Sequence, residues 1–347
     1  MSGKTNPGNF FEDFEIGQEL VHATPRTVTE GETALYTALY GGRFALQSAD
    51  RAAQDIGYPG APIDDWLVFH IVFGKTVPDV SLNAVANLGY AQGRFLLPVY
   101  PGDTLSATST VIGLKENSNG KTGTVYVNSV GRNQEGRIVL DYCRWVMIRK
   151  RDESAPAPEP VVPDLPDRVD PATLAAPGVD LADYDPRVIG QPHRFGDYKV
   201  GEKIDHVDGV TIEEAEHMMA TRLYQNTAKV HFNQHTEGEG RFGRRLVYGG
   251  HIISLARGLS YNGLAPAMWI AAINAGGHTA PCFAGDTVYA WSEILETADL
   301  DGPLGALRIR TVACKNGNAA EFPYMGDDGK YARGVVLDLD YWALIAK

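Results

Sequence analysis

The stretches "LPVYPGDTL" at residues 97–105 and "APCFAGDTV" at residues 280–288 decide the fold of this chain. Each has an aromatic residue shortly before a Gly-Asp turn, then a Thr and an apolar residue. Polar and apolar residues alternate after both turns, in "SATSTVIG" in the first case and in "YAWSEIL" in the second. Such alternation is typical of a half-buried strand. The same turn therefore leads into a strand twice in one chain.

Three further pairs of segments match in the same order. They are "FEDFEIGQEL" (11–20) with "FGDYKVGEKI" (195–204), "VTEGE" (28–32) with "VTIEE" (210–214), and "VLDYCRW" (139–145) with "VLDLDYW" (336–342). Four matching blocks in one order indicate a duplicated unit. In the second pair, a Thr precedes a Glu by three residues, as Thr29 and Glu32 or as Thr211 and Glu214. This spacing predicts a capping box, and so a helix start at the same place in both units.

Each unit has the pattern of an α+β fold. An extended segment, a capped helix and a buried helix come first, and several strands separated by turn signals follow. A sheet wrapped around one central helix satisfies this order. We place the units at residues 1–151 and 193–347. Residues 152–192 are rich in Pro, Ala and Asp and lack periodicity, which predicts a surface linker that buries no core.

Charge and cysteine content exclude several classes of function. The 347-residue chain has a formal charge of −12, which argues against nucleic-acid or anionic-membrane partners. Its three cysteines form no CxxC pair, so neither a disulfide framework nor a thiolate zinc site is indicated. The N-terminal segment has no leader pattern, and no apolar stretch approaches the ~20 residues that span a bilayer. We expect a protein of the reducing cytoplasm.

The order of elements resembles the hotdog fold of the MaoC-like and (R)-specific enoyl-CoA hydratases, here as a double hotdog. These enzymes carry a motif Gly-Asp-x-Asn-Pro-(Ile/Val)-His whose Asp and His hold the reacting water. In the second unit, "QNTAKVH" (225–231) places Asn226 at the aspartate and His231 at the histidine. In the first unit, "GGRFALQ" (41–47) has Gly42 and Gln47 there. The resemblance thus implies a single working site, in the second unit, with an amide in place of the acid.

A second feature of the site is the segment "LVYGGHIISLARGLS" (246–260). Its apolar spacing predicts a helix that begins just after Gly249 and Gly250. A helix N-terminus offers unpaired amides, and glycine allows a ligand to approach closely. We therefore expect these two residues to polarise a thioester carbonyl. The first unit has Asp64 and Asp65 at this entrance, where a negative charge would repel an enolate.

Several residues are candidates for substrate binding. Lys229, Arg241, Arg244 and Arg245 form a basic cluster suited to the phosphates of coenzyme A, with a solvated charged loop as the alternative. Arg222 lies one helical turn before Asn226 and is a candidate for a substrate carboxylate. Tyr248 and His251 flank the glycines and are candidates for substrate contact. His251 and His278 are interpreted as residues that either pack in the fold or contact the substrate. His231 and His235 also fit an HxxxH metal pair, but no acidic or cysteine ligand completes it, so we expect no metal.

The amino-acid sequence of the second unit is similar to that of the mesaconyl-CoA hydratases, also called β-methylmalyl-CoA dehydratases. This resemblance implies an acyl-CoA substrate with a branched C5 dicarboxylic acyl group, no cofactor besides the coenzyme A that the substrate carries, and His231 as general acid/base. Two alternatives stay open: an (R)-specific hydratase of monocarboxylic enoyl-CoA esters, and a hotdog thioesterase or acyl-CoA-binding protein. We expect a homodimer, because hotdog units usually cover their sheets by association.

Overall fold

The computed structural model describes residues 3–347. In the part of the first unit that the structure describes, six helical elements and five strands follow the order that the sequence predicts, with the helices before most of the strands. Its elements are η1 (Phe11–Asp13), β1 (Glu19–Thr27), α1 (Glu30–Tyr40), α2 (Ala45–Ser48), α3 (Asp50–Gln54), α4 (Asp65–Thr76), η2 (Val77–Ser81), β2 (Ala84–Phe95), β3 (Thr104–Glu116), β4 (Thr122–Arg132) and β5 (Ile138–Arg149).

The second unit repeats this order after two short helices of the linker. The elements are η3 (Pro171–Thr173), α5 (Pro186–Ile189), η4 (Phe195–Asp197), β6 (Lys203–Thr211), α6 (Glu214–Leu223), η5 (Lys229–His231), α7 (Gln234–Gly238), α8 (Gly249–Leu264), β7 (Trp269–His278), β8 (Thr287–Asp299), β9 (Leu304–Lys315), η6 (Ala319–Glu321) and β10 (Val335–Ala346).

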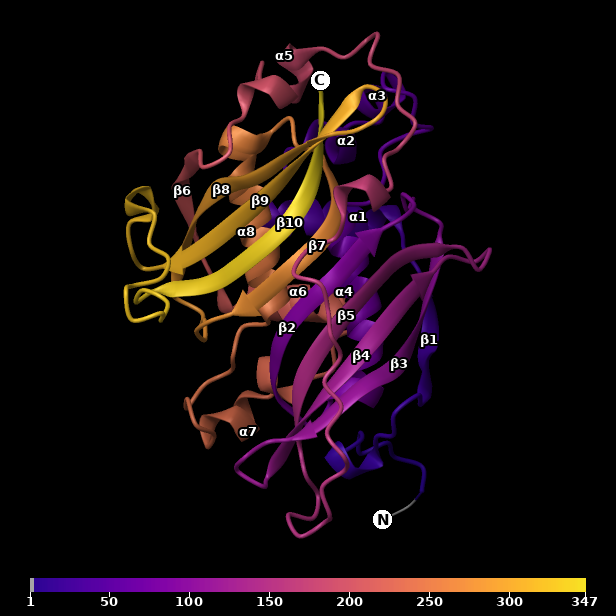
Figure 1. The fold of residues 1–347 in the computed structure, drawn as a ribbon, viewed down its shortest axis with the longest axis vertical. Coiled ribbons are helices and arrows are strands. Elements are labelled where there is room, and N and C mark those ends of the chain that lie inside the picture. Colours follow the sequence, from indigo (N-terminus) through magenta and orange to yellow (C-terminus); the bar gives the residue numbers. More distant parts are fainter. Residues whose placement is uncertain (1–2) are drawn as a thin grey trace.

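All ten strands form one antiparallel sheet in the order β1-β3-β4-β5-β2-β7-β10-β9-β8-β6 (Figure 1). The two units join where β2 pairs with β7, with Tyr90 opposite Gly276 and Arg94 opposite Ala272. Each unit thus supplies five neighbouring strands. The association that covers hotdog sheets takes place here within one chain.

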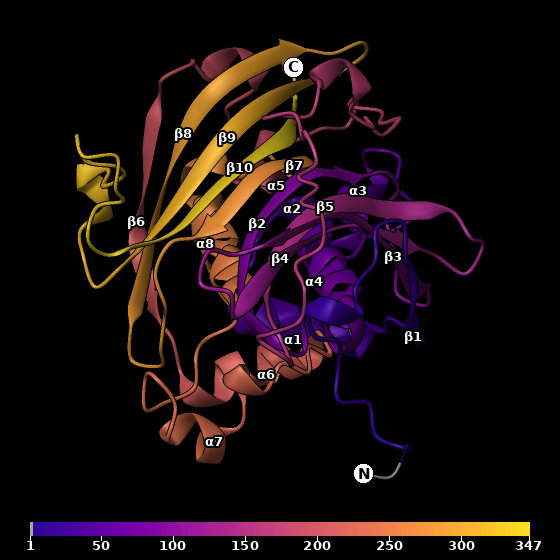
Figure 2. The same cartoon turned by 60° about the horizontal axis from the view of Figure 1, so that its bottom comes forward.

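The sheet curves around the two long helices (Figure 2). Helix α4 lies against β3, β4 and β5, and α8 lies against β6, β8, β9 and β10. The predicted apolar stripe explains the position of α8, because Ile252, Ile253, Leu255 and Ala256 are all buried. Helices α1 and α6 contact each other and α8. The predicted wrapped-sheet α+β architecture is therefore correct for both units.

A buried polar pair repeats in the two units, although the sequence comparison did not identify it. The Nε2 atom of His22 lies 2.8 Å from the hydroxyl of Ser109, and Nε2 of His206 lies 2.8 Å from the hydroxyl of Ser292. Both histidines are buried on the first strand of their unit. This correspondence supports the duplication independently of the matched segments.

Only one of the two predicted capping boxes forms. The amide of Thr29 donates to the carboxylate of Glu32 at 2.6 Å, as expected at the start of α1. The prediction for the second unit is wrong, because Thr211 is the last residue of β6 and its hydroxyl lies 2.8 Å from that of Thr287 on the next strand. The N-cap of α6 is Glu213, which makes no side-chain cap.

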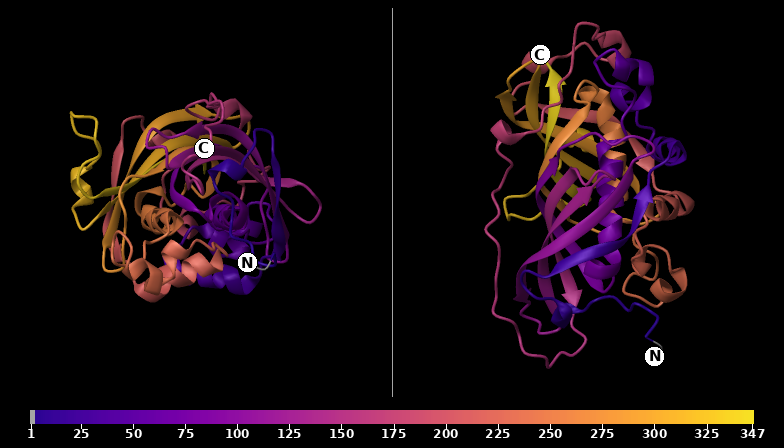
Figure 3. Two further views of the ribbon diagram at one scale, coloured as in Figure 1. Left: turned by 90° about the horizontal axis from the view of Figure 1, so that it is seen from below. Right: turned by 90° about the vertical axis from the view of Figure 1, so that its right-hand side faces the viewer.

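The linker runs along the outside of the molecule (Figure 3), but parts of it are buried. The side chains of Val169, Tyr184 and Ile189 are buried in a hydrophobic cluster with the second unit. The amide of Val169 donates to Asn274 at 2.8 Å, and its carbonyl accepts from the indole of Trp342 at 3.0 Å. The expectation that this segment buries no core is wrong at these positions. A few scattered apolar side chains of the linker can be buried here because the folded units already provide an apolar surface for them to pack on.

Within residues 3–347, no helix is both long enough and apolar enough to cross a membrane.

Candidate active site

The loop after α6 positions the two residues that the family motif singles out. Gln225 adopts a left-handed φ of 53° where the first unit has Gly41 at 58°, and this conformation ends the helix in both units. The side-chain oxygen of Asn226 then accepts from the amide of Ala228 at 3.0 Å. This Asx turn leads into η5, which ends at His231. Both Asn226 and His231 are buried.

One nitrogen of His231 is committed to the fold. Its Nδ1 atom lies 2.8 Å from the carbonyl oxygen of Leu246. Because a carbonyl can only accept, Nδ1 carries the hydrogen and Nε2 of the neutral ring is left with a free lone pair. Burial lowers the pKa of His231 to about 4, and the contact with Leu246 raises it only in part. The ring is therefore neutral at physiological pH and can accept a proton at Nε2.

The N-terminus of α8 is open, whereas that of α4 is closed. At α4, the carboxylate of Asp64 accepts from the amide of Trp66 at 2.9 Å. At α8, the N-cap residue is Tyr248, which makes no side-chain cap. The first amides of a helix have no carbonyl partner within it. The amides of Gly249 and Gly250 are thus available to a negatively charged oxygen, and the dipole of α8 favours one there.

The two glycines also have a role in packing. A Cβ atom on Gly249 would lie 2.4 Å from the ring of His278. A Cβ atom on Gly250 would lie 2.3 Å from the ring of Tyr248 and 2.6 Å from that of His70. The missing side chains thus give room to rings of the protein itself, a requirement that the sequence did not indicate.

His278, for which the sequence left packing and substrate contact as alternatives, lies against the start of α8. It is the last residue of β7, and its Nε2 atom lies 3.3 Å from the hydroxyl of Tyr90 on β2. Burial lowers the pKa of His278 to about 4, and His231 lowers it further. The two histidines therefore flank the start of α8. A single histidine at the end of a strand has no periodic signal that could have revealed this.

His251 does not belong to this group. It is buried, and its Nδ1 atom lies 2.9 Å from the hydroxyl of Tyr40, which in turn lies 2.6 Å from that of Tyr224. Burial lowers its pKa to about 3. The ring thus packs between α1, α6 and α8, and the expectation that His251 contacts substrate is not supported because its ring faces this interior. Tyr248, by contrast, stacks edge-on to His231 with ring centroids 5.5 Å apart.

A pocket of about 460 Å³ lies beside Asn226. Its walls come from β1, the C-terminal end of α4 and the loop after α6, and they include Arg222 and Lys75. Arg222 is exposed, while Lys75 is buried and donates to the carbonyl of Thr24. Burial lowers the pKa of Lys75 to about 8, and Arg26 adds to this effect. The structure thus brings Arg222 and Asn226 together in a pocket with two cationic side chains.

The predicted basic cluster is only partly available to a ligand. Lys229, Arg241 and Arg244 are exposed, and the guanidinium of Arg244 lies 4.0 Å from the ring centre of Phe283. Arg245 forms an ion pair with Glu214, and its side chain is only 12% exposed. Arg245 is therefore less accessible to a phosphate than the other three residues, and its charge is already paired within the fold.

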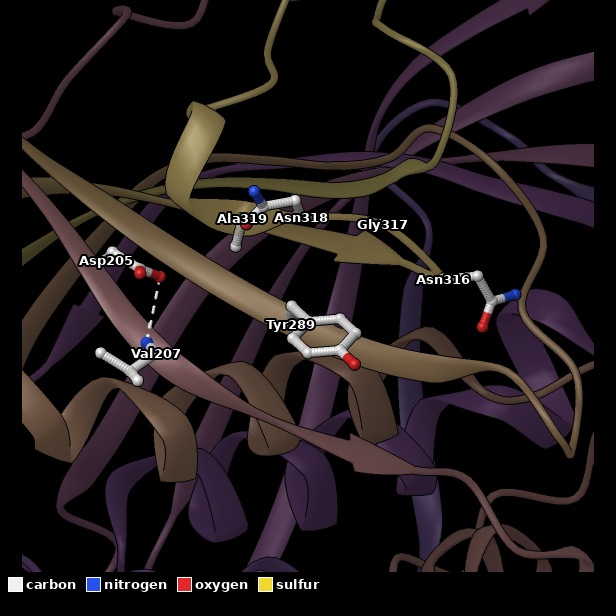
Figure 4. Close-up of a pocket in the computed structure, with 7 residues that line it drawn as sticks. All are labelled: Asp205, Val207, Tyr289, Asn316, Gly317, Asn318 and Ala319. Carbon is white, nitrogen blue, oxygen red and sulfur yellow. Dashed lines mark hydrogen bonds between the residues drawn. The ribbon is translucent and has the colours of Figure 1, made fainter.

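A second pocket, of about 400 Å³, lies at the far edge of the second unit. It is lined by residues of β6, β8 and the loop after β9, including Asp205, Tyr289 and Asn316 (Figure 4). None of the predicted site residues lines it. This pocket is therefore separate from the residues that the family motif singles out.

The structure gives no support to the HxxxH alternative. His231 ends η5 and His235 lies in the separate helix α7, so the two do not share a helical face. Among residues 3–347, no three His, Cys, Asp or Glu side chains are grouped as metal ligands would be.

In the first unit, the side-chain amide of Gln47 donates to the carbonyl of Met268 at 3.0 Å, so the counterpart of His231 has a purely structural contact.

Comparison with known proteins identifies the family. A family model described as mesaconyl-CoA hydratase matches residues 2–324. The chain belongs to the mesaconyl-CoA hydratase family. It is 66% identical over 100% of its length to the β-methylmalyl-CoA dehydratase of Chloroflexus aurantiacus, of which 99% is covered. It is 61% identical over 99% of its length to the mesaconyl-CoA hydratase of Cereibacter sphaeroides, of which 100% is covered.

Solved structures agree with the predicted fold of this family member. A MaoC domain protein dehydratase from Chloroflexus aurantiacus is 65% identical, covers 100% of this chain and 99% of its own, and superposes with a TM-score of 0.98. A Mycobacterium tuberculosis protein described as a double hotdog fold is 27% identical over 97% of this chain and 98% of its own, with a TM-score of 0.77. The predicted family and the predicted double hotdog are both confirmed.

Proposed function

We propose that this protein interconverts mesaconyl-CoA and β-methylmalyl-CoA by reversible addition of water. The observation that carries the proposal is the pairing of a neutral His231, with its Nε2 lone pair free, and an uncapped start of helix α8. Membership of the mesaconyl-CoA hydratase family supplies the substrate, and its two close relatives are named for the two directions of this reaction.

The proposed reaction uses His231 as both base and acid. In hydration, Nε2 takes a proton from water while the hydroxyl oxygen adds to C3 of the enoyl group. The π electrons move onto the thioester oxygen, and the amides of Gly249 and Gly250 stabilise this enolate. The proton then passes from Nε2 to C2 on the same face, which restores the carbonyl. General acid/base catalysis contributes about 10² to 10⁴ in rate, and each oxyanion donor about 3 kcal/mol.

Asn226 has a limited role in this scheme. Its oxygen accepts from the amide of Ala228, and its side-chain NH₂ can only donate. An amide can hold the attacking water but cannot take its proton. We therefore propose that Asn226 positions water and leaves both proton steps to His231.

Cations on the surface complete the proposal for the substrate. Exposed Lys229, Arg241 and Arg244 would contact the phosphates of coenzyme A, where screening by salt makes each contact weak.

No cofactor is needed for the proposed proton transfers, so a chelator should not change the rate. Buried thiols at all three cysteines suit the cytoplasm that we propose as its compartment.

We also propose that two chains associate as a homodimer. The two five-stranded halves of the sheet already pair through β2 and β7 within one chain. Strands β1 and β6 are therefore left at the two ends of the sheet. Light scattering on the purified protein tests this proposal, and a mass of one chain would contradict it.

The direct test of the function is to incubate the protein with mesaconyl-CoA. We expect loss of the enoyl-thioester absorbance and formation of β-methylmalyl-CoA until equilibrium is reached. Turnover of crotonyl-CoA without turnover of mesaconyl-CoA would favour a monocarboxylic hydratase. Release of free coenzyme A, measured with a disulfide reagent, would favour a thioesterase.

A further inference from the structure

An arginine without an acidic partner lies on the inner face of the first unit's sheet. Arg144 of β5 is 0% exposed. Its guanidinium donates to the hydroxyls of Thr76 at 2.7 Å and Ser81 at 3.3 Å and to the side-chain oxygen of Asn87 at 3.5 Å. It also lies 4.2 Å from the ring centre of Phe73. All of these partners are neutral, and within residues 3–347 no ion pair joins Arg144 to a carboxylate.

This arrangement is unfavourable for an empty protein. A buried charge without a counter-charge destabilises the fold, and an arginine cannot escape by losing its proton at physiological pH. Burial lowers the pKa of Arg144, whereas the neighbouring phenols of Tyr142, Tyr90 and Tyr248 raise it. A charge kept in such a position indicates that an anion binds there.

The unpaired polar atoms around Arg144 are two donors and two hydroxyls. The Nε atom of Arg144 and the side-chain NH₂ of Asn87 are buried and have no hydrogen-bond partner, and the same is true of the hydroxyls of Tyr248 and Tyr142, which can donate or accept. Unpaired buried donors are rare in native proteins. A carboxylate offers about four acceptor positions, so a single carboxylate can accept from several of these groups at once.

Arg144 lies next to the proposed active site. It is directly opposite Tyr90 in the pairing of β2 with β5, and opposite residues have Cβ atoms about 5 Å apart. The hydroxyl of Tyr90 reaches Nε2 of His278 at 3.3 Å, and the His278 ring packs on Gly249. Tyr248, whose phenol also acts on the pKa of Arg144, lies edge-on to His231 with ring centroids 5.5 Å apart. One side chain thus separates Arg144 from each of the two site histidines.

The duplication supports an anion-binding role for Arg144. The matched segments "VLDYCRW" and "VLDLDYW" place Tyr341 of the second unit where the first has Arg144. Tyr341 lies near the closed start of α4, with its ring centroid 6.1 Å from that of Trp66. At this position of the repeat, the residue beside the open helix N-terminus is therefore a cation and the residue beside the capped one is neutral. The buried arginine near the capped start is Arg257, whose charge acts on the carboxyl of Asp64. The two ends thus differ in whether a carboxyl group of the protein faces the buried arginine.

We propose that Arg144, assisted by the hydroxyl of Tyr248, binds the distal carboxylate of a short dicarboxylic acyl-CoA ester. The proposal rests on the proposed function and deepens it, because it names the group that separates dicarboxylic from monocarboxylic substrates. It differs from the assignment suggested by the sequence, in which Arg222 has this role. Arg222 is exposed, and an exposed cation discriminates less because water screens it and solvates it when unpaired.

The test compares two substrates in one set of variants. Mesaconyl-CoA carries the distal carboxylate, and tiglyl-CoA has a methyl group at the same position. In Arg144→Met, we expect the ratio of kcat/KM for mesaconyl-CoA to that for tiglyl-CoA to fall about 10- to 100-fold, the loss of one charge-assisted hydrogen bond. Arg144→Lys should recover part of the ratio. The thermal midpoint of Arg144→Met should equal or exceed that of the wild type.

Several results would overturn the proposal. An equal loss on both substrates, or no loss, in a folded Arg144→Met protein would do so, and so would a selective loss in Arg222→Ala alone. If Arg144→Met does not fold, Tyr248→Phe decides, because it removes only a hydroxyl and must lower the ratio in the same direction. Failure of the proposed function is a separate outcome, seen as a wild type that does not hydrate mesaconyl-CoA. In that case, calorimetry of mesaconyl-CoA against tiglyl-CoA binding to wild type and Arg144→Met still tests the carboxylate contact.

Discussion

The Nδ1 atom of His231 donates to the carbonyl oxygen of Leu246 at 2.8 Å. Leu246 precedes the first turn of α8, so this contact ties the proposed base to the helix whose amides would stabilise the enolate. It also determines which nitrogen handles the proton. The consequences for pH dependence and for substitutions follow from this geometry.

The rate of hydration should not change between pH 8 and pH 6. Burial lowers the pKa of His231 to about 4, so the base is fully neutral over this range. Because the folded-state pKa lies below the unfolded value of about 6.5, both activity and the stability contributed by this group are present above pH 6.5 and are lost as the pH falls toward 4. Initial rates measured with circular dichroism at each pH separate the two effects. A half-maximal rate near pH 6.5 in folded protein would contradict the lowered pKa.

Replacement of His231 by Gln should lower kcat by about 10² to 10⁴, because the amide can hold water but cannot accept its proton. The KM for mesaconyl-CoA should change much less. His235→Gln is the matched control, since this histidine is exposed and lies in α7. Steady-state kinetics of both variants check the prediction. Full activity in the His231 variant would show that another group is the base.

Gly249→Ala should disturb the site through His278. The new Cβ atom would lie 2.4 Å from the His278 ring, which must then move away from Tyr90. We expect a loss of roughly 1–3 kcal/mol in the free energy of unfolding, as for overpacked sites, together with reduced kcat/KM. Gly277→Ala is the control, because a Cβ atom there would meet nothing within 4 Å. Denaturant titrations and kinetics on both variants provide the measurement, and equal effects would argue against the steric explanation.

Asn226→Asp should fold normally, because a carboxylate oxygen can replace the amide oxygen that accepts from Ala228. The added negative charge would lie in the same site as the carboxylate of a dicarboxylic substrate, and like charges repel each other. We therefore expect kcat/KM for mesaconyl-CoA to fall at least about tenfold. Crotonyl-CoA, which lacks the second carboxylate, should not show this loss. If both substrates improve, the amide has no link to the dicarboxylic acyl group.

Much of the fold could be predicted from local patterns. The Gly-Asp turns before β3 and β8, the alternation within those strands and the apolar stripe of α8 each occupy a short segment, and each indicates its own element. The two cap predictions show the limit of this approach. Thr29 and Thr211 occur in similar text, but one lies at a helix start and the other at the end of a strand. In the structure Thr211 corresponds to Thr27, which ends β1 and lies opposite Thr104 as Thr211 lies opposite Thr287. A shift of two residues between the units is thus enough to separate the two cases.

By itself, the sequence determined the duplication, the α+β class and the position of Asn226 and His231, because these depend on residues near each other in the chain. Tertiary structure alone decided that His278 packs on Gly249 and that Tyr90, Arg144 and Tyr248 come together. The contact of Tyr90 with His278 spans 188 residues. It exists because β2 of one unit pairs with β7 of the other, and no local spacing encodes which side chains then face each other across that seam.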